Sequence, residues 1–315
     1  MRRLVFTPFA LLILGALELS AGSSVPEIPI GVNLVRNGTF EGGTGWQPAG
    51  WSRLDRLTSF WADMKAGEKI DPPGIERAAG SLPSGKYLLI DTDVLLSQYE
   101  ARRDELDANP NAPPPQKTPV KPPGFDTVGG TYGVAVRSDP ITIDPEGYYN
   151  ISAWCKGVWV KTADTDFMPM IFVKAYTSEG AGGREREVAR KYLACRADED
   201  KGWQFFTWRR PFAPGRLRKD VKVEYVRLIV FCYWPRHLYG FDDIRFFRVP
   251  EPPEEEKSPL EKDPEGKHGT AVKGGEDEDW LPPPVPGSSG KPAKPAEPPE
   301  DFEALRELIG GDGQR

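Results

Sequence analysis

Side chains able to act as acids, bases or nucleophiles are few in this 315-residue chain, and their spacing fits no common catalytic arrangement. Only two histidines are present, His237 in the segment WPRHLYG and His268 in a Pro-rich segment, so a serine hydrolase would lack a well-placed base. The sequence contains no G-x-S-x-G, H-E-x-x-H, phosphate-binding loop or dinucleotide fingerprint. Asp242 and Asp243 are the most obvious carboxylate pair, but adjacent strand residues point to opposite faces and cannot flank one glycosidic bond. The residues therefore predict a protein that is not an enzyme.

The three cysteines, Cys155, Cys195 and Cys232, do not have the spacing of a zinc site. Cys155 and Cys232 fall in expected strands, where a reduced cysteine often fills a small apolar space. An odd number permits at most one disulfide with one thiol left over, so the sequence leaves the state of the three thiols open.

Aromatic and cationic residues alternate with apolar residues in two expected strands, 148–160 and 221–234. We expect these strands to lie in the same sheet, with the apolar set facing the core. The outward set is Trp154, Lys156, Arg227, Phe231 and Tyr233. Sugar rings stack on aromatic faces and form hydrogen bonds at their edges, so this face is the candidate ligand site. Alternatively, an insertion in the domain covers the face and makes its aromatic residues a second core.

These strands belong to a series of nine short segments with period-two alternation, separated by Gly, Pro and Asp turns. The expected strands are Asn33–Phe40, Gly50–Leu54, Lys86–Asp91, Gly130–Arg137, Tyr148–Val160, Pro169–Thr177, Trp203–Phe212, Val221–Trp234 and Phe241–Val249. The series predicts an all-β sandwich over residues 32–249 rather than a βαβ fold.

An insertion over residues 92–125 interrupts the strands. Residues 94–106 (VLLSQYEARRDEL) have helical spacing and good helix formers. The Pro-rich stretch that follows cannot pair in a central strand and favours an extended conformation. We expect a short helix followed by an exposed loop, either as a plain surface elaboration or as the cover of the candidate ligand face.

The two ends of the chain differ from the middle in composition. Residues 1–22 carry two arginines, a short apolar stretch and small residues, and so predict a cleaved signal peptide, with an uncleaved membrane anchor as the alternative. Residues 23–31 are expected to form an exposed lead. Residues 250–300 are rich in Pro, Glu and Lys and nearly lack aliphatics, so we expect a disordered C-terminal tail. Residues 301–310 are expected to form a short amphipathic helix that either binds a protein partner or is transient.

The segment Asn33 to Trp51 reads NLVRNGTFEGGTGWQPAGW. It resembles the opening of carbohydrate-binding modules of the galactose-binding-like jelly-roll class, which often begin with N-L-x-x-N-G-x-F-E and continue with P-x-G-W. The segments YNISAWCK, W-x-x-F to Pro214 and FDDIRF resemble later strands of the same class, in the same order. The resemblance covers about 215 residues and implies a jelly-roll fold, although a fold does not specify a ligand.

The resemblance also implies a structural calcium that ties the first strand to the last. Glu41 and Asp242 are the side chains that match the family's calcium ligands, with nearby carbonyls supplying further oxygens. Alternation along 241–247 supports a special role for Asp242, because it places this carboxylate on the same face as Ile244 and Phe246. The alternative is that both carboxylates are hydrogen-bonded caps at strand ends.

These observations favour an exported, non-catalytic module that binds a polysaccharide or glycan on an aromatic sheet face, secreted or held in the cell envelope or periplasm. The alternative is a structural or interaction protein of the cell envelope that uses the sandwich as a scaffold and the tail as a contact. The formal net charge of −6 and the absence of a strong basic field argue against nucleic acid as a partner. No membrane span is expected after removal of the signal peptide.

Overall fold

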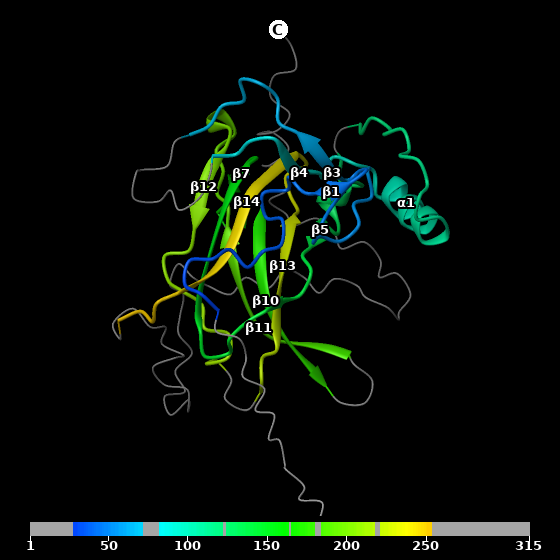
Figure 1. Ribbon diagram of the computed structural model, residues 1–315. Helices are drawn as coiled ribbons and strands as arrows, with labels where there is room; N and C mark the ends of the chain where they lie inside the picture. Colours follow the sequence, from blue (N-terminus) through cyan, green and yellow to red (C-terminus); the bar gives the residue numbers. More distant parts are fainter. Residues whose placement is uncertain are drawn as a thin grey trace, which may run out of the picture.

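Alternating apolar residues along the strands produce two five-stranded antiparallel sheets that pack face to face (Figure 1). The computed structural model describes residues 28–71, 82–121, 124–163, 165–179, 184–217 and 221–253. Within these ranges the fold is an all-β jelly-roll sandwich with one α-helix in an insertion, as the sequence predicts.

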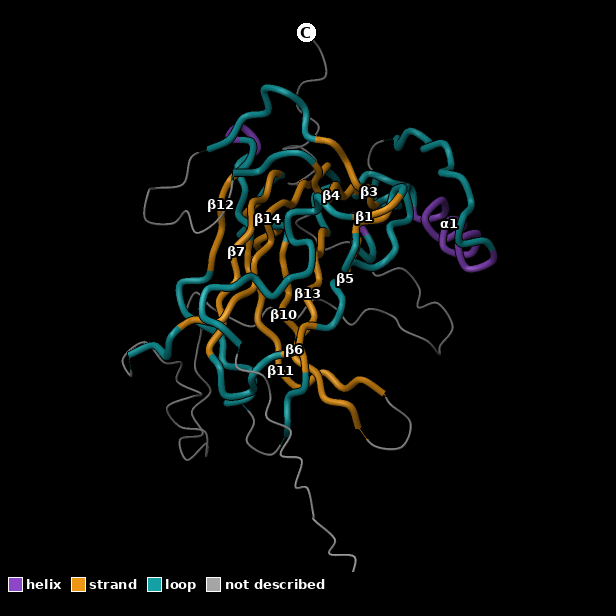
Figure 2. Tube along the Cα trace, viewed as in Figure 1, coloured by secondary structure: helices purple, strands orange, loops and turns teal. Residues whose placement is uncertain are grey.

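One sheet, called here the β13 sheet, has the strand order β11-β10-β13-β5, and β6 also pairs with β13. Its strands are β5 (Val134–Arg137), β6 (Ile141–Thr142), β10 (Met170–Glu179), β11 (Arg184–Ala194) and β13 (Tyr225–Cys232). In the tube view the far ends of β10 and β11 extend beyond the neighbouring strands (Figure 2).

The other sheet, called the β7 sheet, has the order β12-β7-β14-β4-β3. Its strands are β3 (Ser59–Asp63), β4 (Lys86–Asp91), β7 (Tyr148–Lys156), β12 (Gln204–Thr207) and β14 (Leu238–Val249). Short two-residue ladders and two 3-10 turns complete the described elements: β1 (Gly43–Thr44) with β2 (Gln47–Pro48), β8 (Val160–Lys161) with β9 (Asp166–Phe167), η2 (Val128–Gly130) and η3 (Glu199–Lys201).

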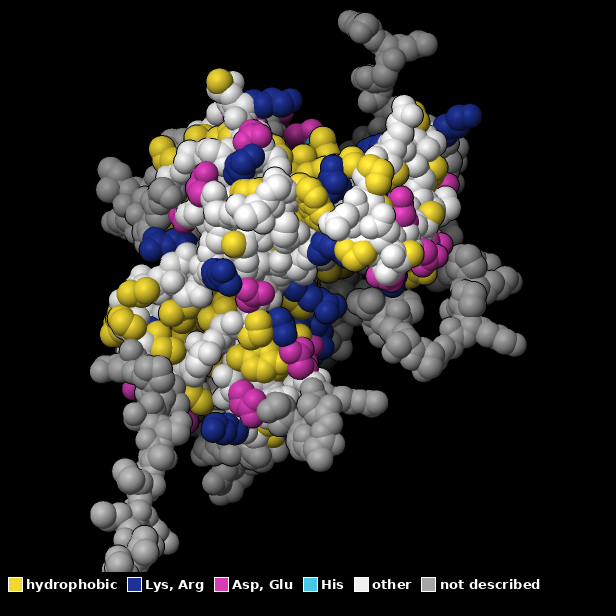
Figure 3. Space-filling model, turned by 45° about the vertical axis from the view of Figure 1, so that its right-hand side comes forward, with side chains coloured by type: hydrophobic (Ala, Val, Ile, Leu, Met, Phe, Trp, Pro, Cys, Tyr) yellow, Lys and Arg dark blue, Asp and Glu magenta, His cyan; other side chains and the backbone are white. Residues whose placement is uncertain are grey.

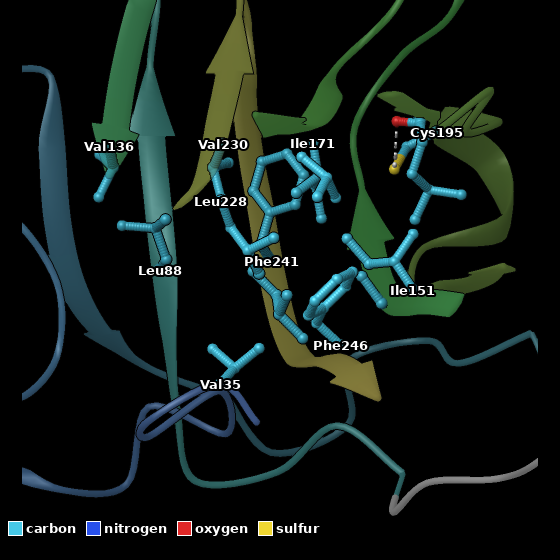
Figure 4. Close-up of a cluster of buried hydrophobic side chains, with 14 of the residues drawn as sticks. Val35, Leu88, Val136, Ile151, Ile171, Cys195, Leu228, Val230, Phe241 and Phe246 are labelled. Atoms are coloured by element: carbon cyan, nitrogen blue, oxygen red, sulfur yellow. Dashed lines mark hydrogen bonds between the residues drawn. The ribbon is translucent and has the colours of Figure 1, made fainter. Parts of the chain in front are cut away.

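The main core lies between the two sheets (Figure 4). Alternation correctly predicts the core-facing side chains of β7 and β13, which include Ile151 and Cys155 on β7 and Leu228 and Val230 on β13. Each of these four side chains is fully buried. The three cysteines are free and buried in this core, where burial raises the pKa of Cys155 and Cys232 well above the usual value of a thiol. The thiols of Cys155 and Cys232 therefore stay protonated at neutral pH and act as apolar packing groups.

The Asn33–Phe40 segment forms no continuous strand, contrary to expectation, but its asparagines hold two parts of the fold together. The Asn33 amide donates to the Ile244 carbonyl at 3.2 Å and accepts from the Phe246 N–H at 3.1 Å, which fixes the segment against β14. Asn37 has a positive φ of 54°, and its amide donates to the carbonyls of Gly42 and Ala49. The N-L-x-x-N-G sequence therefore shapes a loop rather than a strand. Gly50–Leu54 likewise contributes only an isolated bridge at Trp51.

The alternation expected at 241–247 is wrong, because β14 contains a β-bulge. Its register with β7 shifts between Asp242 and Arg245, and Asp243 has a positive φ of 41°. A bulge adds one residue to a strand and changes which side chains face the core. Phe241 consequently lies in the core, and Asp242 is instead paired with Trp154, whose side chain lies outside the main core.

The insertion contains α1 (Leu96–Ala108), which lies beside the sandwich and not over a sheet face (Figure 1). The helix confirms the sequence expectation, with its bounds shifted by two residues. Its Arg102 is only 1% exposed, and the guanidinium donates to the carbonyls of Asp55, Ala112 and Pro113 at 2.8–3.1 Å. The loop after the helix is mostly exposed, as expected, but Arg102 anchors its first residues.

Of the helices in the described part of the chain, none is long and apolar enough to cross a lipid bilayer. The expected signal peptide (1–22), most of the expected lead (23–31), the expected tail beyond residue 253 and the expected helix at 301–310 lie outside the described residues.

Candidate functional site

The expectation that the two aromatic strands share one sheet is wrong. β7, which carries Trp154 and Lys156, and β13, which carries Arg227 and Phe231, belong to opposite sheets. Their outward side chains therefore point away from each other, one pair on each outer face of the sandwich. The five expected ligand-binding residues consequently divide into two separate groups.

The outer face of the β7 sheet is covered at Trp154. This side chain is 2% exposed and packs in a second apolar cluster with Tyr87 and Trp203. Partly buried residues of the segment that follows β3, such as Met64 and Ile70, pack against the same cluster. The cover thus comes from residues 62–70 and from Trp203, and not from the inserted helix.

Lys156 belongs to this cover as well. Its Nζ donates to Glu68 Oε2 at 2.5 Å and to the Tyr87 hydroxyl at 3.2 Å, and lies 4.9 Å from the ring centroid of Trp203. Burial would raise the pKa of Glu68, but hydrogen bonds from Lys156, the Lys65 backbone and the Trp203 indole lower it below the usual value. The Lys156 ammonium is therefore already bound to an ionised carboxylate.

The outer face of the β13 sheet carries a different aromatic group. The rings of Phe231 and Tyr233 are stacked, with centroids 6.4 Å apart and an interplanar angle of 9°, and both side chains are half-buried. Phe167 lies 6.5 Å from Tyr233 on one side, and Phe172 lies 6.0 Å from Phe231 on the other. Phe172 in turn contacts Tyr192 at 5.9 Å. We call these five residues the aromatic row.

A small apolar cluster supports the aromatic row from the sheet. Met168, Met170, Phe172 and Ile229 are each less than 10% exposed, and they form a core separate from the one between the sheets. The more exposed rings of Tyr192 and Phe231 pack against this cluster. Burial also raises the pKa of Tyr233, so its hydroxyl remains a hydrogen-bond donor at neutral pH.

The sequence indicates only some residues of the aromatic row. Alternation in the expected strand Pro169–Thr177 places Phe172 opposite the core, although it was not selected as a site residue. Tyr192 lies on β11, which was not expected at all, because its RERE sequence lacks the apolar alternation of a half-buried strand. Phe167 lies on the two-residue β9.

Beyond the aromatic row, the same face is charged. Cross-strand register places Arg227 on β13 opposite Lys174 on β10, and Lys174 opposite Arg190 on β11. The Arg227 guanidinium lies 2.6 Å from Glu185 Oε1, and Lys174 Nζ lies 2.8 Å from Glu187 Oε2. Hydrogen bonds from Tyr225 and Arg227 lower the pKa of Glu185, so this carboxylate stays ionised at neutral pH.

The two expected calcium ligands approach the same backbone segment. Glu41 Oε1 accepts a hydrogen bond from the Lys86 N–H at 3.0 Å, and Asp242 Oδ2 accepts one from the Ser84 N–H at 3.1 Å. Burial raises the pKa of Asp242 to about 7, against the effect of hydrogen bonds from the Asp243 and Ser84 amides. The negative charges of Asp243 and Glu41 raise it further.

This arrangement is compatible with structural caps at strand ends and with a calcium site. Their backbone hydrogen bonds are those of structural caps, whereas the burial of an acid beside two others favours a bound cation. Within the described ranges no three His, Cys, Asp or Glu side chains are grouped so that they could hold a metal ion. A calcium ion here would therefore take Glu41, Asp242 and backbone carbonyls as its oxygen ligands.

No protein-family model matches the sequence, and no match was found among curated protein sequences. The fold is similar to that of Family 16 Carbohydrate Binding Module-2, at 12% identity and a TM-score of 0.33, over 68% of this chain and 99% of that one. A Stig cyclase from Fischerella sp. TAU matches at 10% identity and a TM-score of 0.36, over 71% and 98% of the two chains. The enzymatically active domain of tailspike protein 4 from Bacteriophage CBA120 matches at 10% identity and a TM-score of 0.36, over 69% of this chain and 22% of that one. At these values the similarities give no argument for a ligand or a reaction.

Proposed function

We propose that this protein is an exported, non-catalytic module that binds a polysaccharide or glycan on the outer face of the β13 sheet. The observation that carries the proposal is the stacked, half-buried pair Phe231 and Tyr233 on a rigid sheet. The two neighbouring rings are only half-buried, so together they leave an apolar aromatic surface open on this face, and sugar rings stack on such surfaces. Arg227 lies on the same face and can donate hydrogen bonds to ring substituents.

Two features of the fold support a single ligand face. The equivalent surface of the β7 sheet is already covered at Trp154, and Lys156 there is occupied by Glu68. The aromatic row on the β13 sheet, in contrast, includes four half-buried rings. A platform of this kind, supported by buried methionines and Ile229, is preorganised and therefore loses little conformational entropy on binding.

The test compares Phe231→Ala with Phe205→Ala in polysaccharide pull-down and calorimetry. Phe205 is also half-buried, but it lies on the opposite outer face beside Trp154, which makes it a matched control. Removal of one stacking ring costs on the order of 1–3 kcal/mol for bases on aromatic side chains. We therefore expect Phe231→Ala to lose about tenfold to a hundredfold in glycan affinity and Phe205→Ala to bind as the unaltered protein does.

Equal binding by both variants would place the ligand elsewhere on the molecule. If the unaltered protein binds no polysaccharide in a broad panel, the sandwich is better explained as an envelope scaffold that makes contacts with other proteins.

A further inference from the structure

The outer face of the β13 sheet contains more cationic than acidic side chains next to the aromatic row. Arg227, Lys174 and Arg190 form one line across three neighbouring strands. Arg137, on the adjacent β5, is exposed and pairs in register with Ile229. In this line the side chains of Arg227 and Lys174 are only 23% and 22% exposed, so they lie against the sheet surface.

Two carboxylates partly neutralise these four cations. Glu187 binds both Lys174 and Arg190, and Glu185 binds Arg227. Arg137 also interacts electrostatically with Glu185. The two acids thus orient the cations but leave the group with an excess of positive charge, even though the chain as a whole has a formal net charge of −6. A local cationic field on an acidic protein favours an anionic ligand at this place.

The cationic line and the aromatic row are neighbours along the strands. Lys174 is two residues from Phe172 on β10, and its Nζ lies 6.0 Å from the centroid of that ring. On β13, Arg227 is four residues from Phe231. Two residues of a strand span about 6–7 Å, so one extended oligosaccharide that stacks on the row would also reach the cations. On the face of the molecule in Figure 3, Lys, Arg and hydrophobic side chains lie next to one another in several places.

We propose that the ligand of this face is an acidic polysaccharide, whose sugar rings stack on Phe231 and Tyr233 while its carboxylate or sulfate groups bind Arg227, Lys174 and Arg137. Arginine suits this task because its planar guanidinium binds carboxylate and sulfate oxygens with two parallel hydrogen bonds. An incoming anion would share these cations with Glu185 and Glu187 without leaving either acid unpaired. This inference rests on the proposed function, and it specifies the chemical class of the glycan.

The experiment measures binding of the full chain to two pairs of polymers that differ only in charge. One pair is polygalacturonate and its methyl-esterified form, and the other is dextran sulfate and dextran. We expect at least tenfold tighter binding to the acidic member of one pair, with an affinity that falls as salt rises. Lys174→Gln and Arg227→Gln should each lower that affinity about tenfold, since each removes hydrogen bonds to a charged group.

Two further variants distinguish a loss of binding from a loss of folding. Arg137→Gln changes an exposed side chain and should weaken acidic binding by a smaller factor while the melting temperature stays unchanged. Lys86→Gln removes a cation that pairs with Asp63 on the opposite sheet, and it should have no effect on binding.

The outcomes separate the two proposals. Equal affinity for the charged and neutral members, or binding of a neutral polysaccharide alone, would overturn the acidic ligand and leave the proposed function intact. Failure to bind any polysaccharide would overturn both. Binding of dextran sulfate and single-stranded DNA with equal affinity and no effect of Phe231→Ala would show attraction to any polyanion, which also contradicts the acidic-glycan site.

Discussion

The side chain of Asp242 is buried, since the residue is only 2% exposed. The negative charges of Asp243 and Glu41 also act on its carboxylate. The bulge in β14 creates this position by turning Phe241 into the core and Asp242 toward the segment 84–86. Burial raises the pKa of this carboxyl to about 7, although hydrogen bonds from the Asp243 and Ser84 amides act in the opposite direction. A divalent cation shared with Glu41 would supply the missing stabilisation.

We therefore predict that calcium stabilises the fold through Asp242. Chelation by EDTA should lower the melting temperature of the unaltered protein, and added calcium should restore it, because a ligand that binds only the native state stabilises it by mass action. Asp242→Asn keeps the shape of the side chain but removes its charge, so its melting temperature should not respond to either treatment. Identical melting curves of the unaltered protein with and without chelator would leave the carboxylates as caps.

At the scale of single elements, the two outer faces of the sandwich differ in how far their aromatic side chains are covered. The strand β7 presents Trp154 to a cover formed by residues 62–70 and Trp203, which a hydrogen bond from its indole Nε1 to Glu68 at 2.8 Å helps to fix. On the other face, Phe231 of β13 and Tyr233, just beyond the end of this strand, have part of their surface open. A large buried ring contributes mainly to stability, whereas a half-open one can also contact a ligand.

This difference predicts that two alanine substitutions lower the stability of the fold by different amounts. Trp154→Ala should lower the free energy of unfolding by about 3–5 kcal/mol, as expected when a large buried aromatic side chain is removed. Phe231→Ala should cost clearly less, because its ring is half-buried. Urea unfolding of the two variants measures both values. A stable, fully folded Trp154→Ala that has lost only glycan binding would show that the β7 sheet carries the ligand after all.

The sequence predicted the strands in which apolar alternation is strong. It did not predict the local structure of segments whose backbone conformation is determined by another interaction. The expected Lys86–Asp91 agrees with β4, and the expected 148–160 and 221–234 contain β7 and β13. The edge strand β11 was not predicted, because it begins with four consecutive charged residues and lacks alternating apolar ones. The bulge at Asp242 and the division of β7 and β13 between two sheets depend on long-range pairing, for which local periodicity provides no signal.

At the scale of the whole molecule, we expect the core between the sheets to stabilise the described domain without the C-terminal region. The last strand, β14, ends at Val249, and the described chain continues to Pro253. In this short extension Glu251 accepts hydrogen bonds from Arg216 at 3.1 Å and from the Tyr148 hydroxyl at 3.4 Å. The residues beyond 253 are rich in Pro and charge, and they offer few apolar side chains for packing.

Truncation at two positions tests this boundary. Removal of residues 254–315 should leave the melting temperature and the glycan affinity unchanged, because no strand of the described domain is altered. Removal of residues 250–315 also deletes Glu251, and since its pair with Arg216 is about half exposed, the additional loss should be at most about 1 kcal/mol. Differential scanning calorimetry of both truncated proteins beside the full chain gives the comparison.

A melting temperature lowered by many degrees after removal of 254–315 alone would mean that the C-terminal region packs on the sandwich. A loss of glycan affinity with an unchanged melting temperature would mean that this region contributes to the ligand site.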